Sequence, residues 1–385
     1  MARQSSGRTG FAFFLALGVG FIGGMAAWWI PSQRAAKDAE APAPQTEPAA
    51  ATRTRRSTVQ GAADTTPWLK GQLHAHTSAS ADSKTSPEDV VRWYEDHGYD
   101  FLVLTDHNQI TRVPSSGSMR VIPGVELTQN LETCSPAPEA GKQCLLHVNA
   151  LFVSDDAKLE NFPPKDVDAR AELFEKAIAQ TDAMKGLAQI NHPNMHWATD
   201  ARLLAALGKK GAMFVEIANQ SEDSDNAGDA NHPSVESLWD QALTAGARLW
   251  GVATDDAHHY ADADKIRAAG GQAFTGDRGF VMVRASNDPA QIRAALERGD
   301  FYSSTGVRLS RLEVKDGRLE IDVAAGNPGE HHFVFIGRGG EFLGETRGRS
   351  GRFDLDYAPA GYVRAVVTDQ AGQKAWTQPV TVHGS

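Results

Sequence analysis

Between residues 68 and 305, short apolar runs alternate with segments whose apolar residues recur at helical spacing. The runs that predict strands are LKGQL, DFLVLT, MRVIPGVEL, CLLHVNALFV, LAQIN, AMFVEIA and RLWGVAT. Helices are predicted at SPEDVVRWYEDHG, at residues 166–185, at ARLLAALGKKG and at SVESLWDQALTAG. Such alternation predicts an α/β fold with a parallel sheet, which is either open or closed into a barrel.

After residue 305 the pattern changes to alternating apolar and polar positions, punctuated by Gly, Asp-Gly and Pro-Ala-Gly. This pattern predicts a small all-β sandwich over residues 308–385. It contains no group of metal-ligand residues, so we expect it to serve in packing or recognition.

The N-terminal pattern is different again, because Phe11 to Ile30 is an apolar run without a charge. As a helix it would be about 30 Å long, the thickness of the hydrocarbon layer of a membrane. Arg3 and Arg8 precede it, which favours a cytoplasmic N-terminus. Residues 1–31 are therefore predicted to be a cytoplasmic stub and transmembrane anchor, and residues 32–66, rich in Ala, Pro and Thr, a flexible linker. A cleaved signal peptide is the alternative.

Charge narrows the choice of partners for the exported body. The whole chain has 38 Lys and Arg against 48 Asp and Glu. Residues 1–60 hold 7 and 3 of these, which leaves 31 basic against 45 acidic residues for the rest. Such an acidic body is a poor partner for nucleic acid. The sequence does not indicate an oligomeric state.

Cys134 and Cys144 are the two cysteines of the chain, and they flank the loop SPAPEAGKQ. In an exported protein such a pair is expected to form a local disulfide bond. The alternatives are two free thiols or a metal site built on the pair.

Histidine, aspartate and glutamate occur on or just after six of the predicted strands. In GQLHAHTSASAD, His74 and His76 are two residues apart, so on a strand both rings would point to the same side. The other groups are Asp106 and His107, Glu126, His147, His192, and Asp255, Asp256, His258 and His259. If the strand ends meet at one rim, as in a parallel barrel, these residues meet there too.

Imidazole nitrogen and carboxylate oxygen are the ligands of Zn, Mn and Fe ions. One ion cannot bind more than six such groups, so the sequence predicts at least two divalent ions. A polar rim without metal is the alternative, but Ser, Asn, Lys and Gly would then be expected in place of so many histidines.

These motifs carry a resemblance to a known family. His74-Ala-His76 with SASAD, the helix from SPED, LTDHN, PGVEL, NHPN and DDAH resemble the motifs of the PHP family, named for polymerase and histidinol phosphatase domains. The likeness covers roughly residues 68 to 307 and is greatest to the exported, carbaryl-hydrolase-like metallohydrolases, which share FYSSTG. It implies a distorted (β/α)7 barrel over residues 67–307, two or three divalent ions at its rim, and hydrolysis, usually of phosphate esters.

The resemblance also implies a ligand set. His74, His76 and Asp256 would bind the first ion, and Glu126 would bridge to a second ion bound by His147 and His192. A third ion would use His107 and His258 with a further histidine, which the sequence lacks between Asn108 and Val125. Asp106 would ligate an ion or orient a neighbouring imidazole, and His107, His258 or His196 could protonate the leaving group.

The sequence therefore predicts a hydrolase that acts on a small or phosphorylated substrate, with its body in the periplasm and a single pass through a bacterial inner membrane. The first alternative is a carbamate, ester or amide hydrolase that uses the same metal site, because both reactions need a Lewis acid and a hydroxide. The second is a metal-stabilised envelope binding protein without catalysis.

Overall fold

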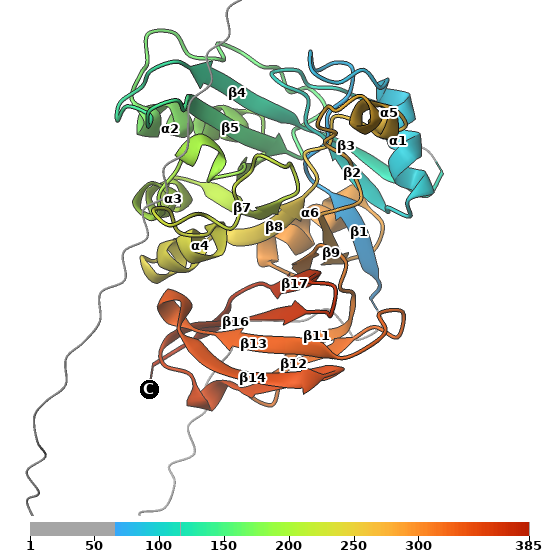
Figure 1. Cartoon of the computed structure of the whole chain (residues 1–385), viewed down its shortest axis with the longest axis vertical. Coiled ribbons are helices and arrows are strands. Elements are labelled where there is room, and N and C mark those ends of the chain that lie inside the picture. The colour runs from blue at the N-terminus through green and yellow to red at the C-terminus, as the bar shows by residue number, and fades with distance from the viewer. Residues whose placement is uncertain (1–65, 116, 385) are drawn as a thin grey trace, which may run out of the picture. The chain divides into compact units, whose positions relative to one another are not determined.

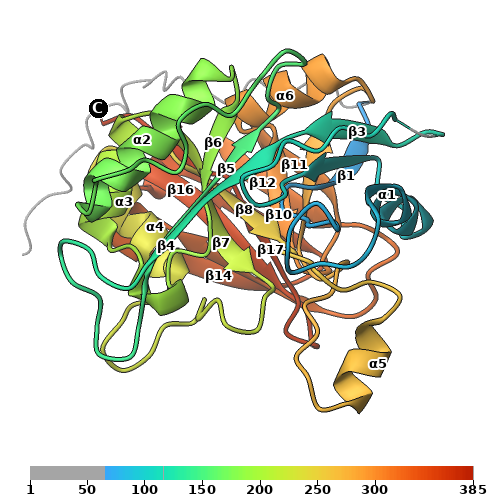
Figure 2. The ribbon, with the colours of Figure 1, turned by 90° about the horizontal axis from the view of Figure 1, so that it is seen from above.

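The computed structural model describes residues 66–115 and 117–384, which belong to one compact unit. The predicted anchor and nearly all of the predicted linker lie outside these residues. Within the described ranges, no helix is both long enough and apolar enough to span a membrane. The described chain contains three sheets and six α-helices (Figures 1 and 2).

The largest sheet joins the start of the described chain to its end. Nine strands follow one another in the order β14-β13-β16-β17-β10-β9-β1-β2-β3, and β18 pairs with β16. In this sheet β1, β2 and β3 are parallel to each other, whereas β9 pairs antiparallel with β1, and β10 antiparallel with β9. The strands are β1 (Trp68–Gln72), β2 (Phe101–Leu104), β3 (Arg120–Pro123), β9 (Phe280–Arg284), β10 (Phe301–Ser304), β13 (His331–Ile336), β14 (Phe342–Gly348), β16 (Gly361–Thr368), β17 (Lys374–Thr377) and β18 (Val380–Val382).

The second sheet has five strands in sequence order, and it contributes most of the candidate metal ligands. Its first two pairs are antiparallel and its last two are parallel. The strands are β4 (Val125–Leu131), β5 (Cys144–Leu151), β6 (Leu187–Ile190), β7 (Ala212–Asn219) and β8 (Trp250–Thr254). A third sheet consists of β11 (Leu309–Lys315), β12 (Arg318–Val323) and β15 (Ser350–Asp354).

Four of the six helices begin at a Ser or Asp side chain that caps a backbone amide. The four predicted helices are present as α1 (Pro87–Asp96), α2 (Arg170–Ala183), α3 (Ala201–Lys209) and α4 (Val235–Thr244), to which the structure adds α5 (Ala263–Ala268) and α6 (Pro289–Arg298). The capped helices are α1, α3, α4 and α6. The Ser86 hydroxyl accepts a hydrogen bond from the Asp89 amide at the start of α1, and Pro87 occupies its first turn. Helices α2, α3 and α4 lie together beside the five-stranded sheet (Figure 1).

The predicted distorted (β/α)7 barrel is wrong, because the strands form separate sheets that do not close. Gly124 separates β3 from β4, and a Cβ atom there would lie 2.9 Å and 3.0 Å from the carbonyl oxygens of Leu104 and Ala150. A larger side chain would therefore not fit at the point where the chain passes from one sheet to the other. Outside the strands, the sheets meet at the isolated bridges Ala75–Ala257 and His107–Glu126. The sheets are also mixed, whereas the strand-helix alternation predicted parallel pairing.

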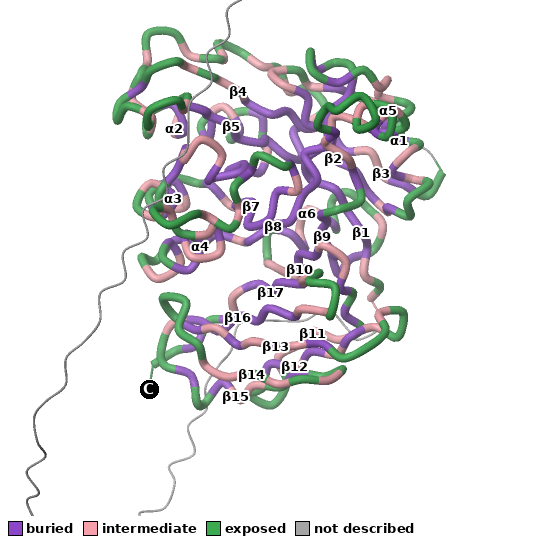
Figure 3. Tube along the Cα trace, in the orientation of Figure 1, coloured by how far each residue is buried: buried purple, intermediate pink, exposed green. Residues whose placement is uncertain are grey.

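The C-terminal strands are packed onto the rest of the unit. Strand β17 pairs with β10, so these strands continue the sheet that contains β1. The Arg364 guanidinium on β16 donates two hydrogen bonds to the Asp240 carboxylate on α4, at 2.8 Å and 2.6 Å, and the Arg364 side chain is only 1% exposed. The most deeply buried chain lies where the two large sheets meet, among β1, β2, β7 and β8 (Figure 3).

Candidate metal centre

The loops after β1 and β8 bring together the first group of candidate ligands. His74 Nε2 and His76 Nε2 are 3.1 Å apart, and Asp256 Oδ1 lies 3.2 Å from each of them. The Glu126 carboxylate lies 3.5 Å from each of the two nitrogens. Four ligands bound tetrahedrally at zinc distances would be about 3.3 Å from one another, so these spacings fit a cation.

A second group shares Glu126 with the first. Glu126 Oε1 lies 3.0 Å from His147 Nδ1 and 3.6 Å from His192 Nε2, and the two nitrogens are 3.1 Å apart. His147 comes from β5 and His192 from the loop after β6, while Glu126 is on β4. One buried carboxylate thus faces two sets of imidazoles, as a bridging ligand would.

A third group contains a residue that the sequence analysis missed. The Asp82 Oδ2 atom lies 3.0 Å from His107 Nε2 and 3.3 Å from His258 Nε2, and His76 belongs to the same group. The sequence analysis looked for a third histidine between residues 108 and 125, but the carboxylate comes from SASAD, six residues after His76. Its position in a known motif was the signal that could have identified it.

Several of these rings hold a hydrogen bond at the nitrogen that points away from the cluster, and this bond fixes the direction of the nitrogen that points into it. His192 is an exception within the described residues, because its Nδ1 is buried without a hydrogen-bond partner. His74 Nδ1 donates to Glu216 at 2.6 Å, and His76 Nδ1 to the Ser80 hydroxyl at 3.0 Å, since that hydroxyl donates to Asp106. Further bonds join His147 Nε2 to Asn130 Oδ1 and His258 Nδ1 to the carbonyl of Asp256. His107 differs, because its Nδ1 lies 2.7 Å from both Thr128 Oγ1 and Glu126 Oε2.

In their neutral form, the rings of His74, His76, His147 and His258 therefore turn a lone pair inward, toward carboxylates. Lone pairs and carboxylates repel each other unless a cation or added protons lie between them. Hydrogen bonds to the outer nitrogen are also the usual way in which proteins orient metal-bound histidine. The donor set thus fits divalent cations.

The pKa values of the histidines and carboxylates in the cluster also indicate that the carboxylates favour positive charge beside them. Burial lowers the pKa of His107, but the carboxylates of Glu126 and Asp82 outweigh it and raise the pKa to about 10. Burial opposes ionisation of Glu126, yet His147, His107 and His74 hold its pKa well below the usual value. By contrast, burial and the neighbouring His258 lower the pKa of His76 to about 4. Protons can thus neutralise the cluster only in part.

Glu216, on β7, is a second residue that the sequence analysis missed. It is fully buried in the apolar run AMFVEIA, and its carboxylate positions two of the candidate ligands. Besides the bond from His74, Oε2 accepts a hydrogen bond from the backbone amide of His192 at 2.6 Å. The remaining donors are Gln189 Nε2 at 3.0 Å, Thr254 Oγ1 at 2.7 Å and Asn219 Nδ2 at 2.9 Å.

Three predicted residues lie outside the three groups. Asp106 is buried and accepts hydrogen bonds from the amide and hydroxyl of Thr77, from Ser80 and from Thr111. It therefore shapes the loop after His76. Asp255 accepts hydrogen bonds from the amides of residues 277–279, and His259 Nδ1 accepts one from the Phe274 amide.

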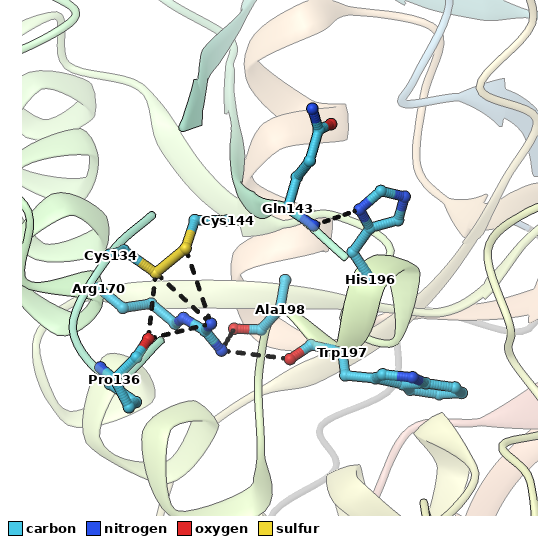
Figure 4. The surroundings of a disulfide bond; sticks show 8 residues. All are labelled: Cys134, Pro136, Gln143, Cys144, Arg170, His196, Trp197 and Ala198. Carbon is cyan, nitrogen blue, oxygen red and sulfur yellow. Dashed lines mark hydrogen bonds between the residues drawn. A yellow bond between two sulfur atoms is a disulfide. The ribbon is translucent and has the colours of Figure 1, made fainter. Parts of the chain in front are cut away.

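The predicted disulfide bond is confirmed, and it braces one side of the centre. Cys134 and Cys144 are bonded across the loop between β4 and β5, the strands that carry Glu126 and His147. The Arg170 guanidinium contacts both sulfur atoms, at 3.5 Å and 4.0 Å (Figure 4). Its other terminal nitrogen donates to the carbonyls of residues 197 and 198, each at 3.2 Å. The disulfide is thereby linked to the turn that follows His192.

His196 lies in this turn and not among the candidate ligands. Its Nδ1 accepts a hydrogen bond from the Gln143 amide at 2.9 Å (Figure 4), and partial burial and the nearby Lys142 lower its pKa. Its backbone has a φ of 52°. A positive φ is uncommon outside glycine, and here the turn is held on both sides by the disulfide loop.

The third group is the most accessible part of the centre. The side chains of Asp82, His107 and His258 are 47%, 24% and 13% exposed, whereas His74, His76 and Glu126 are at most 1% exposed. Solvent therefore reaches the centre most readily at the third group.

No protein-family model matches this chain, and no curated protein matches it. The class of the site follows from its side chains alone. It is a buried cluster of histidines and carboxylates that could hold metal ions.

Proposed function

We propose that the chain is a metal-dependent hydrolase, related to the PHP family by its motifs, and that it cleaves phosphate esters. The observation that carries this proposal is the sharing of Glu126 by two ligand groups, with a third group beside them on the accessible side. Sites in which one carboxylate faces two cation positions are well suited to phosphoryl transfer, because much negative charge must be neutralised.

The residues would divide among the cations as follows. His74, His76, Asp256 and Glu126 would hold one ion, Glu126, His147 and His192 a second, and Asp82, His107 and His258 a third. When bound, such ions lower the pKa of a coordinated water and neutralise the charge on the phosphoryl oxygens. Zn, Mn and Fe are compatible with this mixture of imidazole and carboxylate.

The chain's own residues supply the remaining functions. Burial of His74, His76 and Glu126 excludes bulk water and strengthens the electrostatic interactions of the site. Glu216 orients His74, and Asp106 fixes the loop that bears Ser80 and Asp82. His107 and His258 lie on the accessible side of the centre, so Nε2 of either ring could hold a proton for a leaving group when no ion is bound there.

We also propose that this body works outside the cytoplasm, as part of a single-pass inner-membrane protein facing the periplasm. The disulfide bond supports export, because structural disulfides persist in oxidising compartments. The apolar run at the N-terminus supports the anchor.

The test combines elemental analysis of the purified full chain with a panel of phosphomonoesters, phosphodiesters, carboxyl esters and carbamates. We expect at least two divalent ions per chain and turnover of a phosphate ester. His74→Ala and Asp256→Ala should abolish turnover, while His332→Ala, a surface histidine paired with Glu345, should leave it unchanged.

Each other outcome points elsewhere. Undiminished turnover in both site variants would contradict the assignment. Cleavage of carboxyl esters or carbamates alone would favour the alternative hydrolase. Bound metal without any turnover would favour a binding protein.

A further inference from the structure

A cavity of about 820 Å³ lies on the other side of the unit, far from the metal centre. It is bordered by the α4–β8 connection, the end of α6, and strands β11 and β18. Trp250 in its wall begins β8, and Asp256 of the candidate centre follows the end of the same strand. At about 3.3 Å per strand residue the two sites are roughly 20 Å apart. The cavity is therefore a separate site.

The wall of the cavity is apolar and firmly held. Leu249, Phe301 and Leu319 are almost fully buried and line it together with Trp250. The Trp250 indole donates a hydrogen bond to the carbonyl of Glu297 at 3.3 Å. The indole also packs on Gly299, where a Cβ atom would be 2.9 Å from the ring. This aromatic wall is thus fixed in place before any ligand arrives.

The buried polar side chains that line the cavity, Tyr362, Thr377 and Gln378, are already hydrogen-bonded within the protein. Gln378 exchanges hydrogen bonds with the backbone of Gly251, at 2.9 Å and 2.8 Å. The Tyr362 hydroxyl donates to Asp240, and Thr377 accepts a bond from the Ala365 amide. The interior therefore favours an apolar group over a polar one.

The border of the cavity, by contrast, carries unpaired positive charge. Arg248 and Arg338 are exposed and have no side-chain partner anywhere in residues 66–115 and 117–384. The other charged residues that line the cavity are paired: Arg298 with Asp300 at 3.0 Å, and Glu313 with Arg311 at 3.5 Å. In a chain with a net charge of −10, two free guanidinium groups beside one apolar cavity suit an anionic ligand.

We propose that this cavity binds an amphipathic organic anion, whose apolar body lies against Trp250 and Phe301 and whose carboxylate or phosphate group meets Arg248 and Arg338. The volume lies within the range of about 300–1,000 Å³ that is usual for small-molecule sites. The proposal goes beyond the proposed hydrolase and does not depend on it, since no candidate metal ligand lines the cavity.

The test is photolabelling of the full chain with a decanoate that carries a diazirine in its alkyl chain, followed by mass spectrometry of the labelled peptides. We expect labelling of the segments 243–250 and 377–383, and competition by decanoate but not by decanol. Thr381→Trp, which places an indole at an exposed position of the lining, should reduce labelling at least tenfold.

Single variants distinguish the contribution of the two arginines from that of the shape of the cavity. Arg248→Ala and Arg338→Ala should each raise the decanoate concentration needed for half-maximal competition by about threefold to tenfold. Arg347→Ala removes another exposed arginine, which is on β14 and does not line the cavity, and it should leave this concentration unchanged.

Three results would overturn the proposal: labelling spread over the whole surface, equal competition by decanol, or full labelling of Thr381→Trp. Circular dichroism melts of each variant verify that the fold is intact. Metal content serves as an independent readout, because it should stay constant in all of these variants.

Discussion

Replacing Glu216 with glutamine tests how the candidate metal centre is positioned. The side chain keeps its size but loses its charge and one of its two acceptor oxygens. In the native protein those oxygens receive five hydrogen bonds, among them those from the His74 ring and the His192 amide. Glu216 contacts neither His74 Nε2 nor His192 Nε2, the two ring nitrogens that face the candidate centre. The variant therefore keeps every candidate ligand.

The magnitude follows from counting the bonds that glutamine cannot make. If its oxygen takes the place of Oε1, its NH2 group faces the His192 amide and the Asn219 NH2 group, and two bonds are lost. The reverse orientation loses three, including the bond from His74. A hydrogen bond to a charged group contributes about 1.5–3 kcal/mol, so in the first orientation, which loses fewer bonds, the free energy of unfolding should fall by about 3–6 kcal/mol. Disturbed ligand orientation should weaken metal binding about 10–100-fold.

The effect should also depend on pH in a defined direction. Burial opposes ionisation of Glu216, but His74 and His192 keep its pKa below the reference value of 4.5. A carboxyl group whose pKa is lower in the folded state stabilises the fold above the unfolded-state pKa and loses this effect as the pH falls. The difference in stability between wild type and Glu216→Gln should therefore be full at neutral pH and shrink below about pH 4.5.

The assay is urea unfolding of the full chain, together with competition against a chelator of known affinity. Glu172→Gln is the matched control, because Glu172 is exposed and pairs with Lys176 one helical turn away. That pair should contribute only about 0.3–0.5 kcal/mol. If Glu216→Gln matched Glu172→Gln in both stability and metal affinity, the positioning role of Glu216 would be refuted.

Three further changes test other parts of the structure. Asp82→Asn should lower the metal content measured by elemental analysis by about one ion per chain, and an unchanged content would exclude the third group as a cation site. Cys134→Ser removes the closure of a short loop and should cost about 2–3 kcal/mol of unfolding free energy, whereas equal urea midpoints would show that the disulfide does not brace the fold. Asp240→Ala leaves the Arg364 guanidinium buried without its partner and should cost about 3–5 kcal/mol, against less than about 1 kcal/mol for the more exposed Asp322→Ala; similar losses in both would contradict the buried pair.

The sequence predicted the local elements better than their assembly. The seven apolar runs correspond to β1 to β8, with MRVIPGVEL divided between β3 and β4. Such runs can be recognised as strands without knowing which strands they pair with. Strands β9 and β10 were missed, and their antiparallel pairing beside β1 depends on contacts between distant segments. Pairing of that kind leaves no local periodic signal, so nothing in the pattern corrected the distorted (β/α)7 barrel that the family resemblance implied.

The candidate site was predictable to the extent that its residues stand out from their surroundings. Histidines at strand ends are conspicuous, and the structure brings His74, His76, His147 and His192 together around Glu126. Asp82 was overlooked because a single carboxylate in a polar loop has the composition of ordinary surface. Glu216 was overlooked for the opposite reason, since it is one charged residue within an apolar strand, and only its five hydrogen-bond donors show why it can be buried there.

The failure of the sheets to close has a consequence for the centre itself. His74 and His107 extend from the ten-stranded sheet, while Glu126, His147 and Asp256 extend from the five-stranded sheet. The two isolated bridges between these sheets, Ala75–Ala257 and His107–Glu126, lie at the same place. Cations bound there would connect two sheets that few backbone hydrogen bonds join. Metal binding would then stabilise the fold, because each ion that binds only the folded state adds its binding free energy to the stability of the chain.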